Sequence, residues 1–227
     1  MYKGIAGSEG IGIGTVVLIE EHEINIETKR VEETGAEIER LQNAIEKFVA
    51  DTNVMAEKMD ITVGKKDADI LRGHIQMLQD PTIEEQITAL IVSEKITAEK
   101  ALDQVLEQTA EIFAQIPDEL LQQRATDFRD IKARILKILL GIEDYDISAA
   151  PAGTVLVAHD LTPSMTAGIV AENIAGILTE VGGRTSHSAI LARAMEIPAV
   201  LSIDGICTSV KNGDRVVLDG TSGEAIV

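Results

Sequence analysis

The chain has 227 residues, 45% of them hydrophobic and 26% charged, which is enough apolar material for one large domain or two small ones. A net charge of −18 and an aromatic content of 2% exclude a nucleic-acid-binding surface, because that function needs basic side chains and stacking platforms. The single cysteine, Cys207, excludes an internal disulfide, and we expect a cytoplasmic protein with no signal peptide and no membrane segment.

The first zone, residues 1–23, is rich in glycine and contains the β-branched run Thr15–Ile19. This pattern predicts one or two strands with tight turns.

The second zone, residues 24–144, reads as helical throughout. Apolar residues recur at steps of three and four from Ile38 to Met59 and again from Ile70 to Leu78, which predicts two amphipathic helices. Three more helix starts follow, each marked by a residue suited to an N-cap. They are Asp80 before Pro81, Thr97, and Asp118 after Pro117, and the last helix is expected to end at Gly141.

The third zone, residues 145–227, changes to alternating strands and helices. A helix is predicted from Pro163 to Glu172 and another begins near His187. The expected strands are residues 154–158, 176–179, 199–201, 215–218 and 225–227.

The most informative stretch is GGRTSHSAILAR, residues 182–193. Two glycines release the backbone, hydroxyl residues suited to an N-cap follow, and good helix formers come next, so His187 should lie in the first turn of a helix. First-turn N–H groups lack intrahelical partners and favour an anion, so a phosphoryl group carried by this imidazole would be stabilised. Further donors around the phosphate are expected from a small set of neighbours: Gly183, Arg184, Thr185, Ser186 and Ser188.

Residue types alone leave the role of His187 open, because a lone histidine near a helix start is usually a surface residue or a cap. The whole motif, however, resembles the phosphohistidine signature of the phosphoenolpyruvate-utilising enzymes, which include Enzyme I of the sugar phosphotransferase system, phosphoenolpyruvate synthase and pyruvate phosphate dikinase. The histidine phosphorylated in that family corresponds to His187.

Two further segments resemble Enzyme I. In LTPSMT, residues 161–166, the resemblance implies that Thr166 hydrogen-bonds the active histidine, although Thr166 also fits an ordinary helix position. The segment GHIQMLQDP, residues 73–81, resembles the helices that dock HPr, the histidine-containing phosphocarrier protein. The partner-binding residues expected at and near this segment are Gly73, His74, Met77, Asp80 and Ile83. Arg124 is added from RATDFRD, residues 124–130, which resembles another segment of the family, although its charges also fit a solvated or salt-bridged face.

The order of zones and the resemblance together predict an α/β phosphohistidine (swivelling) domain, residues 1–23 and 145–227. It is interrupted by an all-α insertion of helical hairpins, residues 24–144, that binds HPr. The expected function is a phosphotransferase that passes a phosphoryl group reversibly between His187 and HPr. The alternatives are a helical interaction module with a structural histidine, and the swivelling domain of another dikinase or synthase.

The resemblance ends at Val227, before the C-terminal barrel in which family members bind phosphoenolpyruvate and Mg²⁺ and dimerise. We therefore expect a monomeric chain that cannot use phosphoenolpyruvate alone and carries no cofactor or metal; its four histidines show no ligand spacing. Departures from the family pattern are Glu9 in the N-terminal turn and Lys65 and Lys66 beside the expected docking helix.

Overall fold

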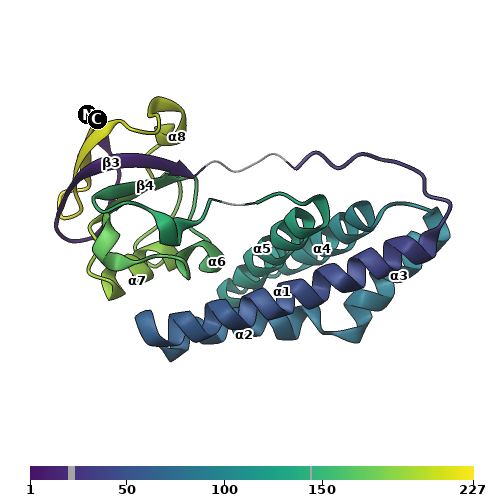
Figure 1. Ribbon diagram of the computed structural model, residues 1–227. Coiled ribbons are helices and arrows are strands. Elements are labelled where there is room, and N and C mark those ends of the chain that lie inside the picture. Colours follow the sequence, from purple (N-terminus) through teal and green to yellow (C-terminus); the bar gives the residue numbers. More distant parts are fainter. Residues whose placement is uncertain (20–23, 144) are drawn as a thin grey trace. The chain divides into compact units, whose positions relative to one another are not determined.

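A computed structural model describes residues 1–19, 24–143 and 145–227 (Figure 1). The domain boundaries expected after residues 23 and 144 fall at positions outside these ranges, and so does His22.

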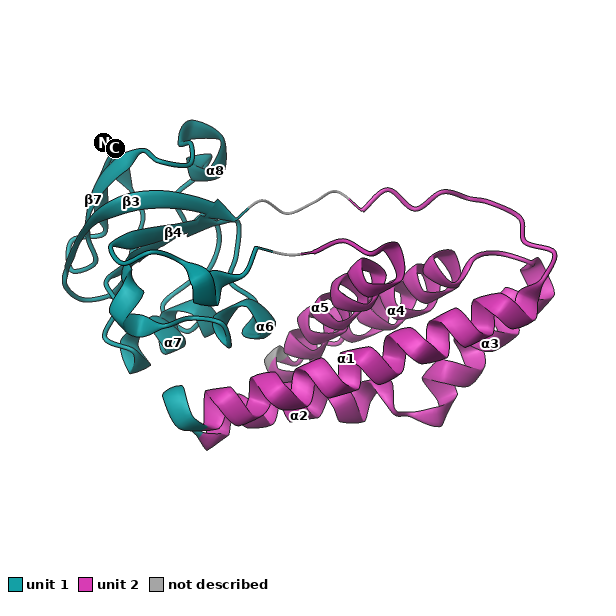
Figure 2. Ribbon diagram, in the orientation of Figure 1, with its two compact units in different colours: residues 1–22, 61–64, 145–227 teal, residues 23–60, 65–144 magenta. Residues whose placement is uncertain are grey.

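The chain divides into two compact units (Figure 2). The α/β unit comprises residues 1–22, 61–64 and 145–227, and the helical unit comprises residues 23–60 and 65–144. The architecture is the expected one, an α/β part that carries a helical insertion.

The α/β unit is built on one mixed sheet with the strand order β1-β8-β7-β3-β4-β5-β6-β2. Strands β3, β4, β5 and β6 run parallel, and antiparallel strands complete both sides. The strands are β1 (Tyr2–Lys3), β2 (Ile5–Ser8), β3 (Ile11–Ile19), β4 (Thr154–Ala158), β5 (Ile174–Thr179), β6 (Ala199–Leu201), β7 (Arg215–Asp219) and β8 (Glu224–Ile226).

The central strand β4 has the sequence TVLVA and is buried at every position. Continuous apolar runs of this kind are typical of parallel strands covered on both faces. In contrast, β7 alternates exposed and buried residues, as expected for an antiparallel strand with one covered face. Every strand predicted in the third zone is confirmed, with end points shifted by up to two residues.

Short helices connect these strands: η1 (Ile147–Ala149), α6 (Pro163–Thr166), η2 (Ala171–Asn173), α7 (His187–Ala194) and α8 (Ile206–Ser209). The helix predicted from Pro163 to Glu172 is therefore wrong in length. It ends at Thr166, Gly168 follows two residues later, and Val170 adopts extended backbone angles. Glycine and a β-branched residue at these positions disfavour a further helical turn.

In the residues that the structure describes, the helical unit contains five helices: α1 (Thr34–Thr62), α2 (Lys65–Leu78), α3 (Pro81–Glu94), α4 (Ala98–Ala114) and α5 (Glu119–Leu140). The predicted caps are confirmed. Asp80, Thr97 and Asp118 each accept a hydrogen bond from a backbone N–H of the first turn, and Gly141 ends α5 in the left-handed conformation. The apolar faces of these helices form one core that includes Leu41, Phe48, Leu102 and Ile131.

Within the described ranges, none of the helices combines the length and the apolar character that a membrane crossing requires.

Candidate functional site

The turn between β5 and α7 places His187 at a helix start. Gly182 has φ +107°, a conformation that favours glycine, and a Cβ there would lie 3.2 Å from the Ser186 hydroxyl. Ser186 is the N-cap of α7, and its Oγ accepts from the backbone N–H of Ala189 at 3.3 Å. His187 is therefore the first helical residue, and its half-buried imidazole lies at the positive end of the helix dipole.

Thr166, the last residue of α6, contacts the ring of His187. Its Oγ1 lies 3.2 Å from Nε2 of the imidazole and donates to the carbonyl oxygen of Pro163 at 2.8 Å. A hydroxyl has one hydrogen, so a hydroxyl that donates to the carbonyl accepts from the ring. The contact thus favours the tautomer with its hydrogen on Nε2. Thr166 is fully buried, which fixes the position of this acceptor.

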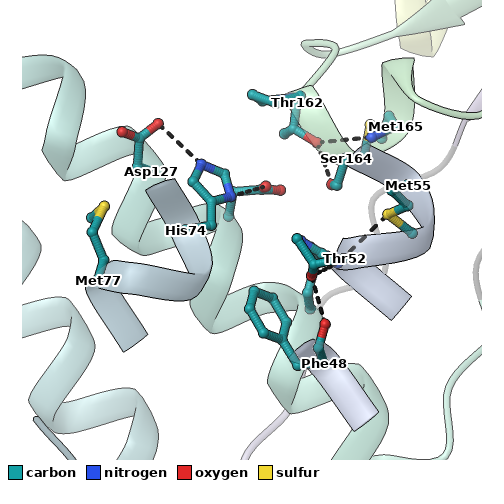
Figure 3. Close-up of polar contacts among 12 residues, drawn as sticks. Phe48, Thr52, Met55, His74, Met77, Asp127, Thr162, Ser164 and Met165 are labelled. Atoms are coloured by element: carbon teal, nitrogen blue, oxygen red, sulfur yellow. Dashed lines mark hydrogen bonds and ion pairs between the residues drawn. The ribbon is translucent and has the colours of Figure 1, made fainter. Parts of the chain in front are cut away.

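Figure 3 shows how the start of α6 is held. The hydroxyl of Thr162 accepts from the backbone N–H of Met165 at 3.4 Å and lies 2.9 Å from the hydroxyl of Ser164. Because this cap fixes the first turn of α6, it also fixes where Thr166 meets the imidazole.

Ser188 points away from solvent and toward the segment before α6. It is fully buried, and its hydroxyl donates to Oδ1 of Asp160 at 3.0 Å. The same carboxylate oxygen accepts from the backbone N–H of Leu161 at 2.8 Å. Residues 160–166 therefore contact both His187 and Ser188 and set the position of the first turn of α7.

The remaining predicted phosphate neighbours lie in the turn itself. The side chains of Arg184 and Thr185 are exposed, and the Arg184 guanidinium makes no hydrogen bond or ion pair within the part of the chain that the structure describes. The carbonyl of Gly183 accepts from the backbone N–H of Ser186, and a Cβ at Gly183 would meet no atom within 4 Å. The turn is thus open on the side of Gly183, and Arg184 can reorient toward an anion.

Arg193 is a residue of this site that the sequence reasoning missed. Arg193, in the last turn of α7, donates to the carbonyl of Gly7 in β2 at 2.8 Å and to the carbonyl of Arg184 at 2.9 Å. It joins the turn to the sheet edge. Its presence in the motif was the only available signal, because its partner Gly7 is 186 residues away.

A second pair supports the loop that enters the turn. Nδ1 of the half-exposed His159 lies 2.9 Å from Oε2 of Glu180. This hydrogen bond holds the pKa of the Glu180 carboxyl below its ordinary value, and the backbone N–H of Cys207 acts in the same direction while burial opposes both. The pair joins the segments that follow β4 and β5.

The helical unit contains a groove of about 600 Å³. Four of the six predicted partner-binding residues line it, namely Met77, Asp80, Ile83 and Arg124. The other lining residues are Gln76, Thr82, Gln86, Gln108, Thr109, Ile112, Phe113, Leu121 and Phe128. The rings of Phe113 and Phe128 stack with centroids 5.5 Å apart, and Ile112 is 58% exposed.

Gly73 and His74 do not line the groove, and the His74 side chain is fully buried, so it offers no surface to a partner. Ile83 is only 8% exposed and lies in the wall of the groove. Ile112 is the apolar side chain most available there, and sequence reasoning missed it because its spacing matches the buried face of α4.

Arg124 links the groove to residues of α2 and α5. Its NH1 lies 3.4 Å from the sulfur of Met77 and 3.5 Å from Oδ2 of Asp127. Oδ1 of Asp127 in turn lies 3.3 Å from Nε2 of His74 (Figure 3). Among the described residues, no group of three or more His, Cys, Asp or Glu side chains is arranged to hold a metal ion.

Comparison with known protein families shows which class of protein this chain belongs to. The model of the N-terminal domain of PEP-utilising enzymes matches residues 3–124, and that of their mobile domain matches residues 150–223. The chain belongs to the PEP-utilising enzymes.

Within that family, the chain is similar to phosphoenolpyruvate-protein phosphotransferases. It is 39% identical to the protein of Mycoplasma capricolum over 97% of this chain and 34% identical to that of Haemophilus influenzae over 100%. It spans about 39–40% of the length of these relatives.

Solved structures are also similar to this chain. A solution structure of an Enzyme I protein superimposes with a TM-score of 0.86 at 38% identity, covering 100% of this chain and 92% of the other. The N-terminal domain of the nitrogen-type Enzyme 1 shares the fold, with a TM-score of 0.68 at 24% identity and coverage of 100% and 93%.

Proposed function

We propose that the chain is the phosphoryl-carrier part of a phosphoenolpyruvate-protein phosphotransferase of the sugar phosphotransferase system. His187 accepts a phosphoryl group and exchanges it reversibly with a histidine of HPr. In the longer relatives, the remaining residues would supply the phosphoenolpyruvate site with its Mg²⁺. The observation that carries the proposal is the imidazole at the start of α7, held through Nε2 by the hydroxyl of Thr166 at 3.2 Å.

In the transfer step, a ring nitrogen of His187 donates its lone pair to phosphorus while the phosphorus–nitrogen bond of the partner's phosphohistidine breaks. The departing ring keeps the bonding electron pair and takes up one proton, the His187 ring releases one proton, and both rings end neutral while the phosphoryl oxygens keep their charge. The protein's contribution is positioning and charge balance, because a loose transition state needs little covalent assistance. The α7 N-terminus and the Arg184 guanidinium would supply the balance.

The groove of the helical unit is the proposed docking site for HPr. It offers the exposed side chain of Ile112 and the half-buried Met77 as apolar contacts, with Asp80 and Arg124 as charged groups beside them. The net charge of −18 favours a basic partner and speeds encounter with it.

The test is transfer from phosphorylated HPr to the full chain, followed by mapping of the label. His187→Ala should abolish an acid-labile, base-stable label without changing the circular dichroism spectrum. His159→Ala, at a histidine of the same unit, is the matched control and should be labelled like the wild type.

Label that persists in His187→Ala, or that maps to another histidine, would overturn the proposal. Binding of HPr without any transfer would favour the alternative, an interaction module whose histidine is structural. Residues 161–166 and 182–193 would then serve the fold alone.

A further inference from the structure

We propose that His74 is a positioning residue: it holds Asp127, which in turn fixes the guanidinium of Arg124 at the edge of the docking groove. This inference rests on the proposed docking of HPr in that groove and adds a residue that never touches the partner.

His74 lies in the interior of the helical unit. The His74 side chain is completely buried in α2, and both of its ring nitrogens face carboxylates of α5. Nε2 lies 3.3 Å from Oδ1 of Asp127, and Nδ1 lies 3.5 Å from Oδ2 of Asp130. A buried imidazole without polar partners would be costly. The Nε2 contact is a hydrogen bond, whereas Nδ1 and Oδ2 of Asp130 lie too far apart for one, so the bond to Asp127 is what fixes the ring and constrains that carboxylate. Figure 3 shows the ring directed toward Asp127.

Asp127 connects the buried ring to the groove. Its Oδ1 faces His74 and its Oδ2 faces NH1 of Arg124 at 3.5 Å, so one carboxylate joins a buried ring to a guanidinium that is 45% exposed. If His74 were removed, the carboxylate would lose the buried partner that sets its rotamer, and Arg124 would lose a fixed counter-charge.

Gly73 and Met77 of α2 lie next to the guanidinium of Arg124. A Cβ added at Gly73 would lie 3.7 Å from its NH1, and the sulfur of Met77 lies 3.4 Å from the same atom. The guanidinium therefore lies against α2 at Gly73 and Met77. Positions 73, 74 and 77 of α2 and positions 124, 127 and 130 of α5 face one another at helical spacing.

An Arg124 side chain held in place would favour binding at a docking surface. A long exposed arginine loses rotamer entropy when a partner immobilises it, and an arginine that is already held loses less. Through Asp127, His74 would thus improve the affinity of the groove for an acceptor group on the partner.

The experiment is a double-mutant cycle on the full chain with HPr as the titrant. In His74→Asn the side chain is too short to reach Asp127, whereas His74→Gln keeps an N–H donor near the position of Nε2. We expect His74→Asn to weaken binding by about three- to tenfold and His74→Gln to stay within about twofold of the wild type. In the Arg124→Ala background, His74→Asn should weaken binding no further, because its effect passes through the guanidinium.

A measurement without the partner separates this inference from the docking proposal. The Nε–H signal of Arg124 in a nitrogen–proton NMR spectrum should be sharp in the wild type and in His74→Gln but exchange-broadened in His74→Asn. If the wild type fails to bind HPr, the docking proposal fails, and this signal still decides the role of His74.

Two outcomes would overturn the inference. One is a full effect of His74→Asn on affinity in the Arg124→Ala background, which would indicate a general structural role. The other is an unchanged Arg124 signal in a folded His74→Asn variant. If that variant does not fold, Asp127→Asn takes its place, since it keeps the shape of the side chain and removes the counter-charge; an unchanged Arg124 signal there contradicts the proposal equally.

Discussion

The side chains around His187 come from two short segments of the α/β unit, residues 160–166 and 180–188, whereas those that line the groove come from four helices of the helical unit, α2 to α5. The first arrangement fixes one ring by short polar contacts and a capped helix start. The second spreads contact over a wide surface that rests on the packing between helices. Chemistry and recognition in this chain should therefore respond separately to mutation.

The largest difference between the two units is expected from a mutation in the core of the α/β unit. Leu156 in β4 is fully buried, so Leu156→Ala should lower the free energy of unfolding of that unit by about 2–5 kcal/mol. Thermal unfolding followed by amide exchange should show lower protection in β4 and unchanged protection in α4 and α5. Loss of protection in both units together would mean that they unfold as one.

Docking should be most sensitive to the exposed apolar side chain of the groove. Ile112→Ala should weaken HPr binding by about tenfold, in line with the ~1–2 kcal/mol typical of an apolar anchor. Calorimetric titration measures this change, and Val92→Ala, at an exposed residue of α3 outside the groove lining, is the control. Equal affinities of both variants would place the docking surface elsewhere.

A smaller effect, on the rate of transfer and not on the affinity for HPr, is expected from a mutation beside the His187 ring. Thr166→Val keeps the shape and removes the hydroxyl that contacts Nε2, which should slow transfer about fivefold, or roughly 1 kcal/mol, and leave affinity unchanged. Single-turnover transfer and titration on the same samples separate the two. Normal transfer together with an unchanged nitrogen chemical shift of the ring would contradict a tuning role for Thr166.

The smallest expected effect is on how folding stability depends on pH. The pKa of Glu180 is depressed in the folded chain, so its carboxylate contributes stability above its ordinary, unfolded pKa and loses that contribution as the pH falls through the folded value. Wild-type stability should therefore fall more steeply than that of Glu180→Gln as the pH is lowered from the ordinary carboxyl pKa through the depressed folded value. Denaturant titrations at several pH values test this; parallel curves would show that the His159 contact contributes nothing.

Local signals in the sequence predicted a large part of the fold. The caps at Asp80, Thr97 and Asp118 and the end of α5 at Gly141 depend on residues a few positions apart, and each is where the pattern indicated. The helix start at His187 was equally legible, because glycine and N-cap preferences act within a single turn. The length of the helix after Pro163 was not, since helix propensity there is weak and the sheet decides where the chain turns.

What the sequence alone determined is the helix caps, most of the strands and, through the resemblance of its motif, the candidate histidine. Only the tertiary structure decided which distant groups meet: Arg193 with Gly7, Arg124 with Met77, and His74 with Asp127. The physical reason is the distance along the chain between the residues that interact. Caps and turns are closed by neighbours along the chain, whereas the groove and its buried polar contacts depend on how whole helices pack, and helical spacing reveals which face is apolar without revealing which partner covers it.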